Sequence, residues 1–264
     1  MGRLSEFEYF DFSIGNNTFL ELCLKMTGIK DNLLEIIEGI NVRFMPIYDV
    51  DLNIVSYELL SSKQGIDTRL LMSNIDSIEG GKTQLFFDVF SKAVSYLDEN
   101  SSQKNITLSI NIGPEELKSD ELMDFLLKTR KKYIKYISLE ILEYSFGVSS
   151  LEIYKNIEKL KNVGYSIIID DFGSKSSDKK RVKMFYSHKF LDGIKLDGIF
   201  INRLKGLAER ELEEYKVYFH SLRDNGIDIT AEFIENSKTF DFAKSLGANK
   251  FQGKFFEKSD KNKK

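Results

Sequence analysis

Eight short runs of largely β-branched and apolar residues alternate with longer amphipathic segments from about residue 40 onward. Alternation of strands with helices is typical of α/β folds, and eight repeats favour a closed barrel over an open sheet. The chain of 264 residues is long enough for one barrel to use most of it. The predicted strands cover residues 42–47, 54–60, 106–112, 137–142, 165–170, 193–196, 227–232 and 249–252.

Apolar residues between most of these runs recur at helical spacing. In residues 84–97, for example, Leu85, Val89 and Ala93 lie on one helical face. The same pattern predicts further helices over residues 115–133, 151–162, 207–225 and 237–246. Only residues 48–53 separate the first two strands, which is a hairpin-sized connection, so the first strand should run antiparallel to the second. The predicted fold is therefore α/β, a TIM-like (β/α)₈ barrel with an antiparallel first strand.

The chain divides into three predicted parts. Residues 1–28 form an N-terminal extension, expected to be a packed helix rather than a partner-binding one, because apolar side chains such as Phe19, Cys23 and Met26 recur at helical spacing. Residues 29–257 form the barrel domain, including a helix around residues 33–40 that plugs or flanks the barrel. The Lys-rich residues 258–264 form a disordered basic tail.

Composition narrows the chemistry. Cys23 is the only cysteine, and His188 and His220 are the only histidines, so zinc sites of the His/Cys kind are nearly excluded. Oxygen ligands for a hard cation such as Mg²⁺ or Mn²⁺ remain. A net charge of −3 argues against binding a nucleic-acid polymer. No apolar run approaches membrane-spanning length and no signal sequence is evident, so we expect a cytoplasmic protein without membrane contact.

Two adjacent carboxylates, Asp170 and Asp171, end the fifth predicted strand directly before Phe172 and Gly173. Uncompensated charges beside an apolar strand are costly, so the pair suggests a bound cation or strongly basic partners. An alternative is a plain strand-end turn in which Asp171 caps a helix.

Polar residues stand at or near the ends of six other predicted strands, where barrel enzymes place their chemistry. They are Glu58, Asn111, Glu140, Lys195, Glu232 and Gln252. Converging acids repel one another unless cations hold them, which favours a two-metal site. Such a site activates water and stabilises the attacking and leaving oxygens of phosphodiester hydrolysis. Lys195 would orient the water or balance the charge.

The order of these residues resembles the motifs of the EAL-domain family of cyclic di-GMP phosphodiesterases. The resemblance covers about residues 30–257. Glu58-Leu59-Leu60 resembles the family motif Glu-Ala-Leu, Asn111-Ile-Gly113 resembles Asn-Leu-Ser, and Glu140-Ile-Leu-Glu143 resembles Glu-Leu-Thr-Glu. The motif Asp-Asp-Phe-Gly is present unchanged as Asp170-Asp-Phe-Gly173. Lys195-Leu-Asp197 resembles Lys-Ile-Asp, Ala231-Glu-Phe-Ile-Glu235 resembles Ala-Glu-Gly-Val-Glu, and Gln252-Gly253 matches Gln-Gly.

The resemblance implies hydrolysis of cyclic di-GMP to linear pGpG in bacterial signalling, with two Mg²⁺ or Mn²⁺ ions. The implied ligands of the first ion are Glu58, Asn111, Glu140 and Asp170. Asp170 would bridge to a second ion completed by Asp171 and Glu232. Lys195 would contact the nucleophilic water, so the implied catalytic residues are Lys195, Glu58, Asp171 and Glu232.

Further roles follow from the same resemblance. Leu59 and Gln252 would support the substrate or the metal ligands. Glu143 would anchor the loop after Asp171, and Glu235 would brace the site from behind. Members of the family commonly form homodimers through the loop and helix after the fifth strand, so a homodimer is a possible assembly.

Several positions depart from the family pattern. Ser62 stands where an arginine holds a substrate phosphate, Met45 replaces a glutamine, and Phe233 replaces a glycine and would crowd the pocket. The segment 174–183 is basic and about four residues longer than in the family. These departures leave open a catalytically degenerate domain that acts as a cyclic di-GMP receptor or binds a protein.

Two narrower alternatives also stay open. The basic residues Lys175, Lys179 and Arg181 either belong to a solvated helix start or replace the missing cation beside the ligand phosphates. The acids themselves either bind metal or only form hydrogen bonds in a metal-independent scaffold.

Overall fold

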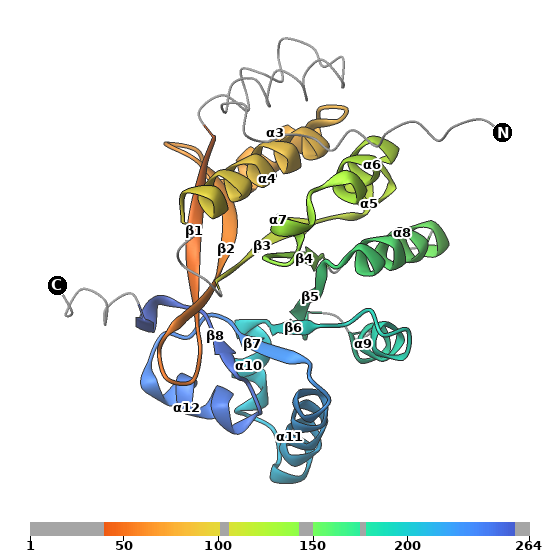
Figure 1. Ribbon diagram of the computed structural model, residues 1–264. Coiled ribbons are helices and arrows are strands. Elements are labelled where there is room, and N and C mark those ends of the chain that lie inside the picture. Colours follow the sequence, from red (N-terminus) through yellow and green to blue (C-terminus); the bar gives the residue numbers. More distant parts are fainter. Residues whose placement is uncertain (1–39, 101–105, 143–149, 175–177, 257–264) are drawn as a thin grey trace.

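The computed structural model describes residues 40–100, 106–142, 150–174 and 178–256 (Figure 1). Within these residues, eight strands form one closed barrel in the order of the sequence, which confirms the predicted fold class. Helices lie around the outside of the strands (Figure 1). The strands are β1 (Ile40–Tyr48), β2 (Ile54–Lys63), β3 (Thr107–Ile112), β4 (Ile137–Ile141), β5 (Ser166–Phe172), β6 (Gly193–Leu196), β7 (Asp228–Ala231) and β8 (Lys250–Phe251).

The first strand has the predicted direction. β1 runs antiparallel to both of its neighbours, β2 and β8, whereas every other neighbouring pair is parallel. Asp49 closes the β1–β2 hairpin, because its carboxylate accepts the backbone N–H groups of Asp51 and Asn53 at 2.9 Å each. A side-chain acceptor of this kind replaces backbone bonds in a tight turn. The short connection therefore reverses the chain instead of crossing over it.

Helices connect the strands within the described ranges. They are α3 (Thr68–Asp76), α4 (Gly81–Glu99), α5 (Pro114–Lys118), α6 (Asp120–Lys128), α7 (Lys131–Ile134), α8 (Ser150–Val163), α9 (Asp178–Ser187), α10 (Gly198–Leu204), α11 (Glu209–Asp224) and α12 (Ser237–Ser245). The predicted N-terminal extension, most of the helix predicted around residues 33–40 and the basic tail lie outside the described residues. Ile40, the predicted end of that helix, is instead the first residue of β1.

The sequence pattern predicted one continuous helix over residues 115–133, and this prediction is wrong. The structure divides residues 115–133 into α5, α6 and α7. Ser119 adopts an extended backbone, and its hydroxyl accepts the N–H of Leu122 at 3.2 Å, so it starts a new helix as an N-cap. Thr129 and Arg130 are also extended and separate α6 from α7. The apolar spacing continues through these breaks, which is why the pattern predicted one helix.

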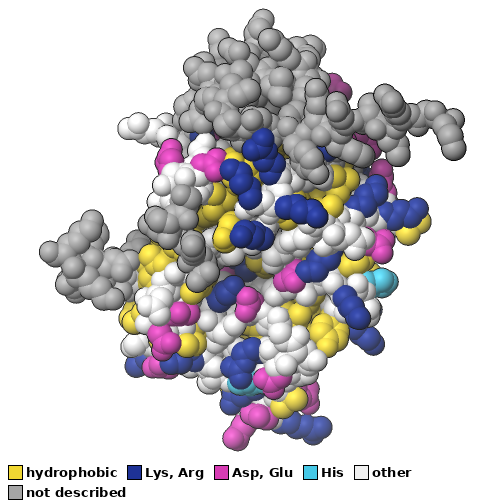
Figure 2. All heavy atoms as spheres, viewed as in Figure 1, with side chains coloured by type: hydrophobic (Ala, Val, Ile, Leu, Met, Phe, Trp, Pro, Cys, Tyr) yellow, Lys and Arg dark blue, Asp and Glu magenta, His cyan; other side chains and the backbone are white. Residues whose placement is uncertain are grey.

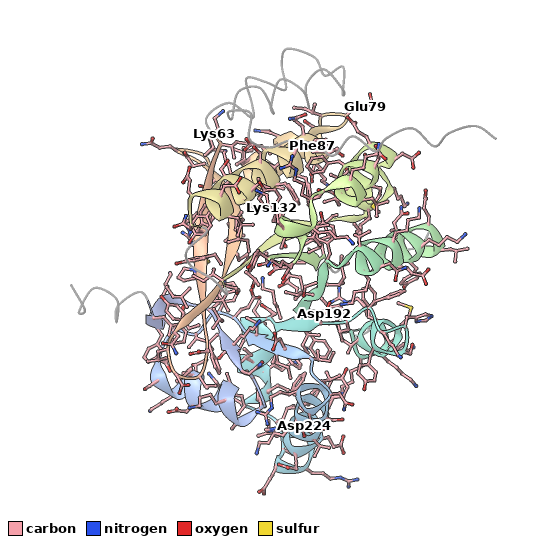
Figure 3. All side chains as sticks on the ribbon, in the orientation of Figure 1. Lys63, Glu79, Phe87, Lys132, Asp192 and Asp224 are labelled. Atoms are coloured by element: carbon pink, nitrogen blue, oxygen red, sulfur yellow. The ribbon has the colours of Figure 1, made fainter. Side chains whose placement is uncertain are left out.

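The core lies in the layer between barrel and helices. Every residue of β4 is buried, as is typical of a parallel strand covered on both sides. Figure 3 places Phe87 among the packed side chains, and its ring meets Phe125 of α6 edge to face with centroids 5.0 Å apart. Burying a side chain of this size contributes about 1.5–3 kcal/mol. This apolar layer offsets the cost of the polar barrel interior described below.

The face of the molecule drawn in Figure 2 carries charges of both signs. In Figure 2, Lys and Arg side chains are interspersed with Asp and Glu on the face in view. No helix among the described residues has the length and apolar character needed to cross a bilayer.

We expect Phe219→Ala to lower the free energy of unfolding by about 3–5 kcal/mol, because it empties part of an aromatic cluster. Phe219 is fully buried on α11 and packs edge to face with Phe172 and Phe200. Urea unfolding followed by circular dichroism measures the change. Val217→Ala on the same helix is the control, since Val217 is 62% exposed and should change stability by no more than about 0.5 kcal/mol. Equal stabilities of the two variants would contradict the packing described here.

Candidate functional site

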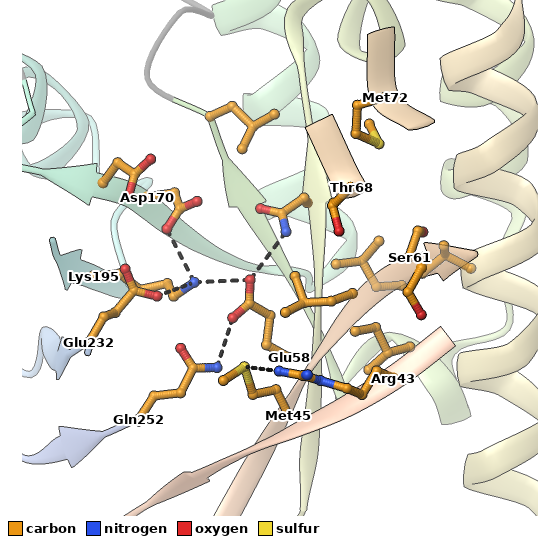
Figure 4. A pocket seen from close by; sticks show the side chains of 18 of the residues that line it. Arg43, Met45, Glu58, Ser61, Thr68, Met72, Asp170, Lys195, Glu232 and Gln252 are labelled. Carbon is orange, nitrogen blue, oxygen red and sulfur yellow. Dashed lines mark hydrogen bonds and ion pairs between the residues drawn. The ribbon is translucent and has the colours of Figure 1, made fainter. Parts of the chain in front are cut away.

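A cavity of about 770 Å³ opens at the carboxyl ends of the parallel strands, and its wall includes β1 and β2 (Figure 4). Its lining includes most of the site residues predicted from the sequence. Those residues are Glu58, Leu59, Asn111, Asp170, Asp171, Lys195, Glu232, Glu235 and Gln252. Glu140 is fully buried and does not line the cavity, and Glu143 lies outside the described residues.

The ammonium group of Lys195 is the centre of the site. Lys195 Nζ lies 2.9 Å from one oxygen each of Glu140 and Glu232, and 3.2 Å from one oxygen each of Glu58 and Asp170. These acids come from β2, β4, β5 and the residue after β7, while Lys195 itself is on β6 and only 2% exposed. Figure 4 shows three of the carboxylates pointing at this nitrogen. Barrel closure therefore gathers acids that are far apart in the sequence around one cation.

Burial and Lys195 set the protonation of the cluster. Burial would lower the pKa of Lys195, but the surrounding carboxylates raise it well above its ordinary value. Burial raises the pKa of Glu140 well above its usual range and that of Glu232 to about 8, against the attraction of Lys195. Burial acts the same way on Glu58, but Lys195 and two amide donors together lower its pKa. One ammonium does not balance four carboxylates, so the cluster favours additional positive charge, either as protons on the carboxyl groups or as a bound cation.

Two amide side chains orient Glu58. Gln252 donates from Nε2 to Glu58 Oε2 at 2.8 Å, and Asn111 donates from Nδ2 to Glu58 Oε1 at 3.3 Å. The carbonyl oxygen of Asn111 is buried and accepts no hydrogen bond from the described residues. A buried acceptor without a donor is costly. A hard cation at the cavity floor would satisfy it, so this side chain fits a metal ligand.

Asp170, Asp171 and Glu232 form a second oxygen cluster. One carboxylate oxygen from each lies within 4.8 Å of the others. In a regular strand, neighbouring side chains point to opposite faces. Here the β5–β6 pairing is irregular between Ile169 and Phe172, and Asp171 has a left-handed backbone with φ of 50°. The irregularity lets both aspartates serve one cluster, and Asp171 belongs to the strand end instead of capping a helix.

Lys179 and Arg181, in the described part of the basic segment after β5, do not line the cavity. Lys179 Nζ lies 4.1 Å from the ring centroid of Tyr215 on α11, and Arg181 is buried with a bond from Nη2 to the carbonyl of Asp170 at 2.7 Å. The alternative that Lys179 or Arg181 replaces the missing phosphate-binding cation is therefore wrong, and Lys175 lies outside the described residues. Instead, Arg43 and Lys254 contribute positive charge to the cavity lining.

Arg43 was missed by the sequence analysis. It lies on β1 opposite Leu60 of β2, and Met45 lies opposite Glu58. Opposed residues of an antiparallel pair share a face, so Arg43 is on the same face as Glu58 and as Ser62, one diagonal step away. The register of the hairpin was the signal that would have found it.

The expected crowding by Phe233 is not observed. Phe233 lines the cavity but is 66% exposed, with φ of 54°, so its ring borders the cavity and does not fill it.

Comparison with known proteins gives a consistent result. The model of the EAL domain family matches residues 32–259. The chain is 27% identical over 227 residues to "Probable cyclic di-GMP phosphodiesterase PdeI" of Escherichia coli K12, covering 81% of this chain and 28% of that protein. It is 32% identical over 133 residues to "Cyclic di-GMP phosphodiesterase PdeA" of Borreliella burgdorferi, covering 49% and 19%. The chain thus spans less than a third of the length of these relatives.

Solved structures share the fold. An EAL domain protein from Listeria monocytogenes superposes with a TM-score of 0.71 at 20% identity, covering 89% of this chain and 97% of that one. The EAL enzyme Bd1971, in a form bound to cAMP and cyclic-di-GMP, gives 0.70 at 18% identity, covering 91% and 68%.

We expect Lys195→Met to lower the free energy of unfolding by about 3–5 kcal/mol at neutral pH without added metal, because it leaves buried carboxylates without their cation. Urea unfolding measures the loss. Lys128→Met is the control, since it breaks an exposed ion pair of 2.7 Å with Asp124 and should cost at most about 1 kcal/mol. A Lys195→Met protein as stable as Lys128→Met would refute the central role of this cation.

Proposed function

The chain belongs to the EAL domain family, and from this premise we propose that it is a metal-dependent phosphodiesterase that hydrolyses cyclic di-GMP to linear pGpG. The observation that carries the proposal is the gathering of Glu58, Asp170 and Glu232 around Lys195 at the floor of a cavity of about 770 Å³. This volume lies in the usual range for small-molecule sites, about 300–1,000 Å³. The names of similar proteins and the ligand of Bd1971 point to the same substrate.

The proposed cofactor is a pair of Mg²⁺ or Mn²⁺ ions. All candidate ligands offer oxygen, which these cations prefer. The first ion would be held by Glu58, Asn111, Glu140 and Asp170, and the unsatisfied Asn111 oxygen supports this assignment. The second would be held by Asp170, Asp171 and Glu232, supported by the spacing of their oxygens within 4.8 Å. When bound, such ions activate water and stabilise charge on the attacking and leaving oxygens.

The reaction adds one water across one phosphodiester. The water oxygen joins phosphorus, the bond from phosphorus to the ribose 3′ oxygen breaks, and the 3′ oxygen takes a proton. Lys195 supports this by holding the acids in one arrangement, and its ammonium would contact the attacking water. Gln252 and Asn111 fix the rotamer of Glu58. A site held in place in this way needs little rearrangement when charge develops.

The second phosphate of a cyclic dinucleotide needs its own positive partner. We assign this role to Arg43, which lines the cavity on the same hairpin face as Glu58. Its guanidinium donates to the thioether of Met45 at 3.3 Å, a weak acceptor, and forms no ion pair with the described residues. Arginine binds phosphate oxygens through paired N–H groups. The cation absent at Ser62 would thus be supplied from the neighbouring strand.

A catalytically degenerate receptor or protein-binding module is the second candidate. The departure that favours it is Ser62, but Arg43 offers a replacement for the lost charge. The acid cluster also favours hydrolysis, because binding a ligand alone does not require so many buried carboxylates.

Incubation of the purified chain with cyclic di-GMP and Mn²⁺ should yield pGpG, detected by chromatography. Glu58→Gln should reduce the rate by roughly a hundredfold or more, because it removes a proposed metal ligand at the floor of the cavity while keeping its shape. Glu213→Gln, at an exposed position of α11, is the matched control and should retain the rate. Undiminished turnover by Glu58→Gln would remove this residue from the mechanism. If the unaltered chain forms no product, the catalytically degenerate receptor is the remaining candidate.

Arg43→Met should raise the KM for cyclic di-GMP by roughly 10- to 100-fold, because it removes one charge-assisted hydrogen bond to the phosphate. Such a bond contributes about 1.5–3 kcal/mol. We expect kcat to change much less, since the residue lies on the wall and not among the acids. Steady-state kinetics separates the two parameters. Arg210→Met, at an exposed position on α11, should leave both unchanged. A wild-type KM in Arg43→Met would exclude this phosphate contact.

A further inference from the structure

The backbone from Asp170 to Gly173 is in an unusual conformation. Asp171 has φ of 50° and Gly173 has φ of 103°, both in the left-handed region. A Cβ atom at Gly173 would lie 2.1 Å from the ring of Phe200, so glycine is required there. A left-handed aspartate persists only where its surroundings hold it. The contacts that hold Asp171 are therefore part of the site.

The first turn of α9 supplies these contacts. Arg181 donates from Nη2 to the carbonyl oxygen of Asp170 at 2.7 Å, on one side of Asp171. Asp178 accepts the backbone N–H of Gly173 at 2.7 Å, on the other side. The two side chains also pair with each other at 3.3 Å. One ion pair thus spans the left-handed residue.

This ion pair is shielded from solvent and faces the backbone. The side chains of Asp178 and Arg181 are each 5% exposed, and neither residue lines the cavity. Hydrogen bonds to charged groups strengthen where water is excluded. Phe172 is held independently, because its ring packs on Phe200 and Phe219. Loss of the ion pair should therefore loosen the backbone on both sides of Asp171, while the bond from the Ser174 N–H to the Asp171 carbonyl remains and the barrel stays folded.

We infer that Asp178 and Arg181 are positioning residues that hold the Asp171 carboxylate beside Asp170 and Glu232 and thereby determine the binding of the second divalent ion. The inference rests on the proposed function. Without the two backbone contacts, Asp171 can return to an extended conformation, which turns its carboxylate away from that of Asp170. Three of the four proposed ligands of the first ion, Glu58, Asn111 and Glu140, lie on β2, β3 and β4, and the carboxylate of the fourth, Asp170, stays paired with Lys195. The first ion should therefore bind normally.

Isothermal titration of the full chain with Mn²⁺ alone tests the inference. The unaltered chain should bind two ions. Arg181→Met should keep one site near its original affinity and weaken the other roughly 10- to 100-fold, as is common when a residue supporting a metal ligand is lost. Arg210→Met should bind both ions as the unaltered chain does. Two unchanged sites in folded Arg181→Met, or fewer than two in the unaltered chain, would overturn the inference.

A double variant guards against misfolding. Arg181→Met alone leaves Asp178 buried without its cation, whereas Arg181→Met with Asp178→Leu removes both charges and both backbone contacts. The double variant should also lose one Mn²⁺ site, with its fold checked by circular dichroism, and wild-type binding of two ions would again refute the role. If the unaltered chain forms no pGpG but the variants still lose one site, the positioning role stands and the proposed hydrolysis fails.

Hydrogen exchange gives an independent readout in the unaltered chain. The Gly173 amide donates to Asp178 and should exchange slowly even without metal. Fast exchange at this amide would show that the contact does not hold the strand end.

Discussion

The contact between the Lys195 ammonium and four carboxylates is the interaction on which the rest of the structure depends. Acids that are buried together are stable only with a compensating charge or with bound protons. Because the acids come from β2, β4, β5 and the end of β7, they converge only when the barrel closes with the correct register. The apolar layer under the helices stabilises that closure, and the closure in turn places the cation. The stability of the barrel and the arrangement of the site therefore depend on each other.

The register of the β1–β2 hairpin places a second charge. Met45 lies opposite Glu58 and Arg43 opposite Leu60, so the acidic floor and a basic wall share one face. A slip of one residue would turn Arg43 away from the cavity. The Asp49 turn fixes this register through two hydrogen bonds of 2.9 Å. A small turn outside the cavity thus decides which cation can face a phosphate.

The sequence predicted the strands and the polar residues at their ends, because a parallel barrel brings equivalent strand positions to one rim. It did not predict what depends on the direction of individual side chains. Arg181 is close to Asp171 in the sequence, whereas Arg43 is far from it, yet of these two residues it is Arg43 that lines the cavity. Arg181 is buried and donates a hydrogen bond to the carbonyl oxygen of Asp170. The composition of the segment does not reveal this direction of the side chain. The break at Ser119 was missed for a similar reason, since one capping hydroxyl outweighed a continuous apolar pattern.

The departures from the family pattern follow the same energetics. Glu58, Asp170 and Glu232 contact Lys195, so replacing any one of them changes a buried charge balance. Ser62 is partly exposed at the end of a hairpin, where water can solvate whatever side chain is present. A cation can therefore move from one strand of the hairpin to the other at little cost in stability. The acids have no such freedom, because each of them contacts the same buried ammonium, and among the described residues no other acid pairs with it.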